Sequence, residues 1–373
     1  MVAFAWRDIS DVDAGGSEVY LDAVLSEFAS WGLDVTLHAR VPPGQEIGRF
    51  SRLKKLTRNG YRLRYLGGPV SSFPLQIIDG LISTPSDRTC VLDVWNGIPF
   101  FSPLWFRGPR VTLLHHAHSE MWKYSVNPIV SRFASFAEIS LISRLYRREP
   151  VVCLSESSKV RATSTLFLKP ENVHVIQPGV CRQFVAADSA KFLDPTVIVV
   201  ARLTAAKRIE ALVEQMMTVK RHVPNLRLLI VGRGPLLQSL IRAVRSGDAD
   251  SWISVLGWLP REQVIEYMAR SWLHVSMSAV EGWGLTVSEA GRCGTASVVC
   301  DSEGLRDSVL HMETGLVVPY ESMWDAVIRL LRDDALRDQL AAGARAMAKD
   351  LTWAATAESL LSVIEYSLES RKR

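Results

Sequence analysis

The sequence predicts an α/β protein made of two Rossmann-like, doubly wound domains. Short apolar runs rich in β-branched residues alternate along the chain with segments of helical periodicity. Two strand-to-helix turns carry glycines, at Gly15-Gly16 and at Gly282 and Gly284. The length of 373 residues exceeds one ordinary domain and suffices for two hydrophobic cores. We therefore expect two parallel sheets, each flanked by helices.

The first domain is expected to begin directly with a strand over residues 2–6. A polar loop follows and ends at Gly15-Gly16, with Ser17 as the predicted cap of the next helix. Apolar residues recur at helical spacing as far as Gly32, and a second strand follows over 33–39. Further strands are predicted over 91–94, 110–114, 151–154 and 173–176. Such alternation is typical of one doubly wound domain.

The second domain is expected to open with the β-branched strand 196–201, which is typical of a strand buried on both faces. The less periodic residues 181–194 mark the joint between the domains. The alternation then continues with helix 208–222, strand 226–231, helix 236–246, strand 253–256, helix 261–270, strand 273–277, helix 285–292, strand 297–300 and a helical tail over 323–368. The predicted domains are 1–185 and 186–355, with a terminal helix over 356–373.

Composition indicates a globular protein that does not bind nucleic acid. The net charge of +4 is modest, and no basic motif interleaved with aromatic residues accompanies it. Five cysteines without a C-x2-C pair fit reduced thiols and form no metal cage. The chain has no apolar run of 18 residues and no signal peptide at its start, so the cytoplasm is the expected location. A start inside a strand also fits a chain that lacks its first few residues.

Two basic segments each have two interpretations. Seven cations and no acid lie between Glu46 and Asp79, namely Arg49, Arg52, Lys54, Lys55, Arg58, Arg62 and Arg64. A solvated hairpin is the preferred interpretation, and a patch for anionic lipid or a charged acceptor is the alternative. Residues 131–148 are predicted to form a helix with Phe133, Phe136, Ala137, Leu141 and Leu145 on one side and Arg132, Arg144, Arg147 and Arg148 on others. A core-facing helix is preferred here, and peripheral contact with the inner face of a membrane is the alternative.

Three histidines follow the predicted strand 110–114, at His115, His116 and His118. The carboxyl end of a strand is where doubly wound folds bind ligands. Zinc binding by the imidazoles is an alternative. However, neighbouring residues of an extended segment point to opposite faces, and no nearby cysteine or H-x3-H pair completes a set of zinc ligands. The sequence therefore predicts a ligand site without a metal.

The stretch from Ser278 to Asp301 predicts a phosphate-binding turn. Gly282 and Gly284 let backbone N–H groups approach a ligand, and the following helix start carries positive partial charge. Glu281 lies in the loop and Glu289 about one turn inside the helix, so they stand at most about 12 Å apart along the axis. Two carboxylates separated by about that distance suit a ligand in which a sugar and a ribose are joined by a diphosphate.

These residues resemble a known family. Glu281-x7-Glu289 followed by Ala-Gly-Arg-Cys-Gly-Thr is similar to the E-x7-E signature of the retaining glycosyltransferases of family 4. Arg202 and Lys207 resemble the family's R-x4-K pair, and 314–318 resembles a later segment of it. The resemblance implies the GT-B fold, in which two Rossmann-like domains face each other across a cleft and the last helix packs back on the first domain. Trp283 stands where the family usually has Phe or Tyr.

The resemblance also implies a role for each residue. Catalysis is assigned to His115, Glu281, Arg202 and Lys207, with the Arg and Lys holding the diphosphate, Glu281 the sugar hydroxyls and His115 the transferred sugar. Donor binding is assigned to Gly16, Gly232, Gly282, Trp283, Gly284, Leu285, Thr286 and Glu289, with Glu289 on the ribose. The acceptor side is assigned to Gly15, Ser17, His116 and His118.

The implied reaction moves a sugar, with retention, from a UDP- or GDP-linked donor to a glycan, lipid or small-molecule acceptor, without a cofactor or metal. A glycoside hydrolase is disfavoured, because it needs two carboxylates roughly 5 to 9.5 Å apart across one bond. A nucleotide-sugar epimerase of the same fold needs an acid–base pair that no motif supplies. A non-catalytic nucleotide-sugar binder is the remaining alternative, and measured donor turnover distinguishes it. The oligomeric state has no signature in the sequence.

Overall fold

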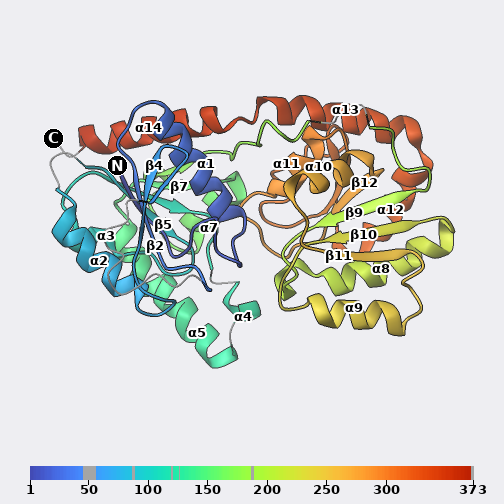
Figure 1. The fold of residues 1–373 in the computed structure, drawn as a ribbon, viewed down its shortest axis with the longest axis horizontal. Coiled ribbons are helices and arrows are strands. Elements are labelled where there is room, and N and C mark those ends of the chain that lie inside the picture. The colour runs from blue at the N-terminus through green and yellow to red at the C-terminus, as the bar shows by residue number, and fades with distance from the viewer. Residues whose placement is uncertain (45–55, 86–88, 119–120, 126, 186–188, 371–373) are drawn as a thin grey trace. The chain divides into compact units, whose positions relative to one another are not determined.

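The chain folds into two compact units, shown as a ribbon in Figure 1. The computed structural model describes residues 1–44, 56–85, 89–118, 121–125, 127–185 and 189–370. Unit 1 comprises residues 1–179 and 353–373, and unit 2 comprises residues 180–352. The boundaries predicted from sequence were placed after residues 185 and 355. Each unit has its own parallel sheet and its own core.

Unit 1 is built on an eight-stranded sheet in the order β3-β4-β2-β1-β5-β6-β7-β8. All neighbours are parallel except β3 and β4, which form an antiparallel hairpin at one edge. The strands are β1 (Val2–Phe4), β2 (Thr36–Ala39), β3 (Leu56–Arg58), β4 (Tyr61–Tyr65), β5 (Val91–Trp95), β6 (Arg110–Leu114), β7 (Val151–Cys153) and β8 (Val173–Val175). The chain order reverses between β1 and β5, so the loops that follow these strands share one edge of the sheet.

The helices of unit 1 are α1 (Gly16–Ser30), α2 (Ser72–Ser83), α3 (Ser102–Trp105), α4 (Trp122–Ser125), α5 (Pro128–Ala137), α6 (Ser143–Tyr146), α7 (Glu156–Ser164) and α14 (Trp353–Ser370). The terminal helix α14 runs along α1 in Figure 1 and packs on α1 and β6. The Ser367 hydroxyl donates a hydrogen bond to the Arg110 carbonyl at 3.0 Å. The end of the chain therefore completes unit 1.

Unit 2 has a six-stranded, fully parallel sheet in the order β11-β10-β9-β12-β13-β14. The strands are β9 (Thr196–Val200), β10 (Arg227–Val231), β11 (Ile253–Gly257), β12 (Leu273–Ser276), β13 (Ala296–Cys300) and β14 (Gly315–Val318). The helices are α8 (Ile209–His222), α9 (Leu237–Ser246), α10 (Arg261–Arg270), α11 (Leu285–Arg292), α12 (Met323–Arg332) and α13 (Asp334–Asp350). This is the Rossmann strand order, and its topological switch point lies between β9 and β12.

The core of unit 2 explains why these segments adopt their structure. The strand β9 is a β-branched run whose Val197, Ile198 and Val199 are at most 2% exposed, as expected of a central parallel strand. On α8 the side chains of Leu212, Met216 and Val219 are fully buried, at the spacing of one helix face. The βαβ unit predicted around Gly282 and Gly284 is confirmed, because β12 and β13 pair in parallel with α11 between them.

The prediction that the apolar side of residues 131–148 faces the core is wrong for Phe133, Phe136 and Leu141, whereas Leu145 packs against the core. The segment forms α5, then a π-helical turn, Glu138–Ile142, and then α6. Phe133 is 72% exposed, Phe136 61% and Leu141 57%, whereas Glu138 is buried. The helical period indicates that one side is apolar but not which side packs inward, and the inward side here combines the apolar Ile142 and Tyr146 with small and polar side chains.

The described part of the basic segment before Asp79 lies in the β3–β4 hairpin. Its three arginines are paired with acids: Arg58 with Asp8, Arg62 with Asp34 and Arg64 with Asp79. The structure therefore confirms the hairpin interpretation for this part. Arg49, Arg52, Lys54 and Lys55 lie outside the described residues. Among the residues that the structure describes, no helix is both long and apolar enough to cross a membrane.

Candidate functional site

Four loops meet at the carboxyl edge of the unit 2 sheet, beside the switch point. The loop after β9 and the loop after β12 are joined by a 2.8 Å hydrogen bond from the Ala279 amide to the Ala206 carbonyl. The loop after β13 joins them through the Ser302 hydroxyl, which donates to the Ser278 carbonyl at 2.7 Å. Parallel strands bring all their carboxyl ends to one edge, so residues distant in sequence converge here.

The fourth loop, which follows β10, approaches the loop after β9 very closely because it carries glycines. A Cβ atom on Gly232 would lie 1.8 Å from the Ala201 carbonyl oxygen, and one on Gly234 would lie 2.4 Å from the Leu203 oxygen. Gly232 also has a φ of +144°, which L side chains rarely adopt. The Leu203 amide donates to the Arg233 carbonyl at 2.8 Å. Gly232 therefore fixes the distance between two loops of the site.

Lys207 and Glu281, both predicted catalytic residues, form an ion pair. Lys207 lies in a short 3-10 turn after β9, and Glu281 lies in the loop after β12. Their side chains are 17% and 22% exposed, so the pair is accessible from solvent. Arg202 belongs to the same loop as Lys207 and is exposed. The switch point thus combines a paired cation and carboxylate with an exposed guanidinium.

The glycine turn leads directly into α11. Gly284 precedes the helix with a φ of +128°, and a Cβ there would lie 2.9 Å from the Ser308 hydroxyl and 3.0 Å from Leu305. Leu285 and Thr286 begin the helix and are half-buried, whereas Gly282 is buried. The ring of Trp283 is 2% exposed, and its Nε1 donates to the Ser288 hydroxyl at 2.9 Å. Trp283 therefore supports the turn from beneath.

Glu289 lies in the middle of α11 and is half-buried. Burial raises the pKa of this carboxyl to about 7, and the charge of Arg261 opposes the rise. Ligand hydroxyls that donate to a carboxylate favour its charged form. The Glu289 side chain is therefore balanced between a neutral and a charged state near neutral pH, and a ligand with hydroxyl groups would favour the charged one.

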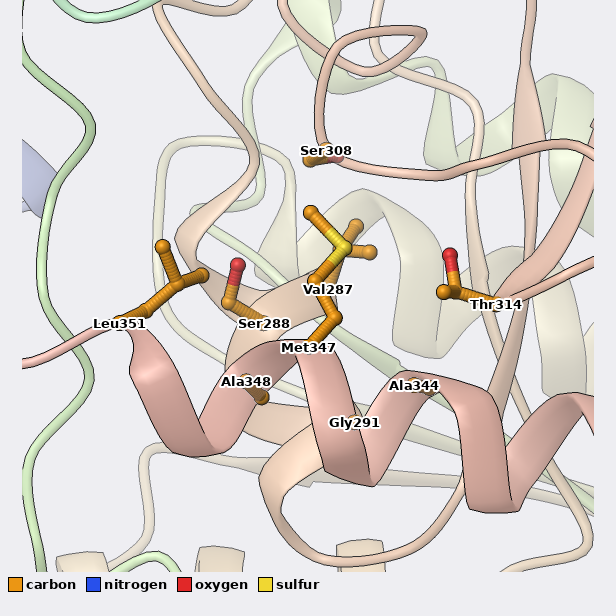
Figure 2. A pocket seen from close by; sticks show the side chains of 9 residues that line it. All are labelled: Val287, Ser288, Gly291, Ser308, Thr314, Ala344, Met347, Ala348 and Leu351. Atoms are coloured by element: carbon orange, nitrogen blue, oxygen red, sulfur yellow. The ribbon is translucent and has the colours of Figure 1, made fainter.

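A small recess lies between α11 and α13 (Figure 2). It is lined by Val287, Ser288, Gly291, Ser308, Thr314, Ala344, Met347, Ala348 and Leu351. The side chain of Met347 extends over Val287 in this view, and the lining is mainly aliphatic. None of the predicted site residues lines it, so we interpret the recess as an imperfection in helix packing rather than a ligand site.

In unit 1, the glycine loop after β1 is held by charged side chains. The Gly15 amide donates to the Glu18 carboxylate at 2.7 Å, and that carboxylate lies 3.4 Å from Arg7. Gly16 is the first residue of α1. Ser17 does not cap this helix as predicted, because Gly15 occupies the capping position and the Ser17 hydroxyl accepts a 3.1 Å hydrogen bond from Asn96. Ser17 thus links the two loops at the switch point of unit 1.

His115 lies directly after β6 and is 3% exposed. Its ring packs edge to face on the Tyr20 ring, with 5.3 Å between centroids. Burial lowers the pKa of His115 to about 4, so the imidazole is neutral at physiological pH. Its Nε2 atom has no hydrogen-bond partner within the part of the chain that the structure describes. A neutral, buried imidazole with one open nitrogen is suited to bind a hydroxyl group.

His116 and His118 do not join His115. Their rings stack on each other with 4.2 Å between centroids, and the His118 amide donates to the Glu138 carboxylate at 2.9 Å. Among the residues with defined positions, no group of three or more His, Cys, Asp or Glu side chains is arranged to hold a metal ion. The three histidine side chains therefore lie in at least two different environments.

Sequence reasoning missed several residues that build these loops. Asn96 contacts Ser17, and Tyr20 contacts His115. The Glu281 amide donates a hydrogen bond to the Glu303 carbonyl at 3.1 Å. Gly304 has a φ of +78° and approaches the Glu281 carbonyl so closely that a Cβ would lie 2.3 Å from it. The Asn-Gly pair after β5 and the Glu-Gly pair after β13 were the available signals, because glycines at strand ends mark close approaches.

Comparison with known proteins agrees with this geometry. Residues 187–347 match the model of the family described as "Glycosyl transferases group 1". The D-inositol 3-phosphate glycosyltransferase of Jonesia denitrificans is 29% identical over 403 residues, covering 95% of this chain and 91% of that protein. A GDP-mannose-dependent alpha-(1-6)-phosphatidylinositol monomannoside mannosyltransferase of Mycobacterium tuberculosis is 25% identical, covering 60% of this chain and 61% of that protein.

The fold is also similar to solved structures. A sucrose-phosphate synthase from Thermosynechococcus elongatus has a TM-score of 0.81 at 18% identity, with 99% of both chains covered. This likeness shows the GT-B fold, as predicted. The family model and the two sequence relatives support a glycosyltransferase.

Proposed function

We propose that the protein transfers a sugar from a UDP- or GDP-linked donor to an acceptor hydroxyl, with retention at the anomeric carbon, as family 4 enzymes do. The observation that carries the proposal is the Lys207–Glu281 pair at the switch point of unit 2, with Arg202 exposed in the same loop. A cation and a carboxylate side by side suit a ligand that is both a diphosphate and a polyol.

The chemistry determines what each group does. The bond between the anomeric carbon and the diphosphate oxygen breaks, and the acceptor oxygen bonds to the same carbon while its proton is transferred to the departing nucleotide. The diphosphate gains charge in this step, which Lys207, Arg202 and the start of α11 are positioned to stabilise. Binding exchanges the Lys207–Glu281 pair for two ligand contacts, so that Lys207 meets a phosphate oxygen and Glu281 a sugar hydroxyl.

Glu289 is assigned to the ribose and His115 to the transferred sugar. The raised pKa of Glu289 fits a carboxyl that becomes charged when ribose hydroxyls donate to it. The lowered pKa of His115 keeps its ring neutral, so the open Nε2 exchanges a hydrogen bond with a sugar hydroxyl without adding a charge. No step in this proposal requires a metal or another cofactor.

We propose an acceptor of the polyol or lipid class. The two sequence relatives carry the names of enzymes that act on D-inositol 3-phosphate and on a phosphatidylinositol monomannoside. Both names describe an inositol ring with a phosphate. An inositol phosphate, free or lipid-linked, is therefore the first acceptor to test, and one of the two names also includes GDP-mannose as the donor.

The experiment begins with thermal shift in the presence of UDP, GDP, ADP and their sugars, with and without EDTA. We expect one series to raise Tm irrespective of EDTA. Turnover is then followed by release of the nucleoside diphosphate across an acceptor panel. Lys207→Ala should lower turnover by about 10²–10³-fold, because it removes one group that stabilises the leaving charge. The exposed Lys349→Ala on α13 is the matched control and should leave turnover unchanged.

Proton NMR of the purified glycoside reads its anomeric configuration, which is compared with that of the donor. An inverted product would refute retention while leaving glycosyl transfer intact. A donor that binds but is never consumed would favour a non-catalytic binder, and a donor converted to its epimer would favour an epimerase. If no nucleotide raises Tm, the donor site is refuted.

A further inference from the structure

The helical run from Pro128 to Tyr146 presents a row of exposed apolar side chains. Ile129 is 71% exposed, Phe133 72%, Phe136 61% and Leu141 57%. The first two steps along this row have α-helical spacing, and the step from Phe136 to Leu141 has the five-residue spacing of a π turn. The π-helical turn thus keeps Leu141 on the same face, and the row is about 18 Å long at about 1.5 Å per residue.

Positive charge accompanies this row. The segment 121–148 contains five cations, Lys123, Arg132, Arg144, Arg147 and Arg148, and all are exposed. Its single acid is Glu138, which is 1% exposed and accepts the His118 amide. The solvent-facing side of the segment therefore combines aromatic and aliphatic groups with arginines, and its one carboxylate is turned inward.

We propose that this face docks on a lipid bilayer that contains anionic headgroups. Phe133, Phe136 and Leu141 would enter the boundary between headgroups and acyl chains, and the arginines would pair with lipid phosphates. In Figure 1, α5 lies at the outer, lower side of unit 1, away from the sheet.

Other occupants fit less well. A nucleic acid would pair with the arginines but would leave Ile129 and Leu141 without apolar partners. A second copy of the chain packed on this face by two-fold symmetry would bring arginines toward arginines, because the same patch contributes from both sides. Only an anionic surface with an apolar layer beneath it satisfies both components of the face.

Docking here would reach the loop that follows β6. Glu138 lies on the π-helical turn and binds the His118 amide, and His118 is three residues after His115. The docking face and the histidine loop are thus joined by a partly buried hydrogen bond. This inference goes beyond the proposed function, since membrane docking is tested without donor or acceptor.

The test is co-sedimentation of the full chain with phosphatidylcholine vesicles, with or without phosphatidylglycerol. We expect binding to the anionic vesicles that weakens at about 0.5 M salt, where surface charges are screened. Phe133→Ser combined with Phe136→Ser should weaken partitioning roughly tenfold or more, because it removes the inserted aromatic groups. Arg144→Gln with Arg148→Gln should remove most of the preference for anionic vesicles. These side chains are largely exposed, and a thermal melt verifies that each variant folds.

The controls match exposure and charge elsewhere on the chain. Val160 on α7 is 61% exposed, as Phe136 is, and Val160→Ser should leave binding unchanged. Arg242→Gln with Arg245→Gln on α9 removes two exposed cations and should also have no effect. Binding that survives the phenylalanine pair, or falls equally in the controls, would overturn the proposal. Self-association that the phenylalanine pair abolishes, without vesicle binding, would assign the face to a second copy.

Discussion

Replacing Glu289 by glutamine separates the cost of burying this carboxyl from its use in ligand binding. In the folded protein its pKa is raised from 4.5 to about 7, so the folded state favours the protonated form. The unfolded chain has no such preference. Stability is therefore lost as pH rises from about 4.5 through 7, because above that range the folded state holds a buried charge.

The magnitude follows from the shift. A rise of about 2.5 pKa units corresponds to about 3 kcal/mol at 1.36 kcal/mol per unit. The side chain is half-buried, and solvent screening lowers the effect to about 1–2 kcal/mol. The glutamine side chain of the variant would be neutral at every pH, so at pH 8 the variant should unfold at a Tm a few degrees above wild type, at about 2–4 °C per kcal/mol. At pH 4 the two proteins should melt together.

Ligand binding should change in the opposite direction. Ribose hydroxyls favour the carboxylate, so wild-type affinity for the nucleotide diphosphate should rise as pH increases through about 7. Glu289→Gln should bind more weakly and lose this pH dependence. Thermal shift at pH 4, 6 and 8, with and without nucleotide, measures both effects.

Glu214→Gln on the exposed side of α8 is the control and should change neither quantity. A variant that is less stable than wild type at pH 8 would refute the burial argument. Unchanged nucleotide affinity in the Glu289 variant would refute its assignment to the ribose. The two outcomes are independent, so each tests its own part of the reasoning.

Three further substitutions test the structure. Gly232→Ala should destabilise unit 2 by about 2–4 kcal/mol in urea unfolding, because the new Cβ would overlap the Ala201 carbonyl. Gly257→Ala is the control and should cost about 1 kcal/mol, because a Cβ there meets no atom within 4 Å. Asp93→Asn should destabilise unit 1 by about 3 kcal/mol, since the buried carboxylate accepts from the Phe100 and Ser102 amides and the Tyr146 hydroxyl; an unchanged midpoint would contradict this. Burial lowers the pKa of Lys191 to about 8. Between about pH 8 and 10.5 the unfolded chain therefore binds more protons than the folded protein, and the stability of the wild type should increase with pH. Lys191→Met should flatten this rise in a pH series of urea midpoints.

The arrangement of the loops at the switch point of unit 2 was largely predictable from sequence. Strand and helix alternate around β9 and β12, a glycine turn follows β12, and parallel topology brings the ends of these strands to one edge. Arg202, Lys207, Glu281 and Gly284 were therefore expected near one another. Their partners were not, because the hydrogen bonds of Glu281 and Gly304 depend on loops whose conformation no periodic pattern encodes.

Unit 1 shows what a periodic pattern leaves open. The apolar side of residues 131–148 was recognised, but its direction was not, since burial depends on what the neighbouring elements offer. The inward side holds Ser131, Glu138, Ile142 and Ser143, and the Ser143 hydroxyl donates to the Ile139 carbonyl. The segment thus packs inward through Ile142 and Tyr146 together with small and hydrogen-bonded side chains.

Glu138, the single buried acid of residues 128–146, connects the histidine loop with the exposed apolar row. Glu138 costs free energy to bury unless it is hydrogen-bonded, and the His118 amide supplies a partner. It lies on the one π-helical turn that the described residues contain, and such turns often mark functional positions. The same turn directs Glu138 toward the histidine loop and Leu141 toward solvent. A purely α-helical segment would change the face on which Leu141 lies relative to Phe136, so the site loop and the proposed docking face depend on the same local feature of the backbone.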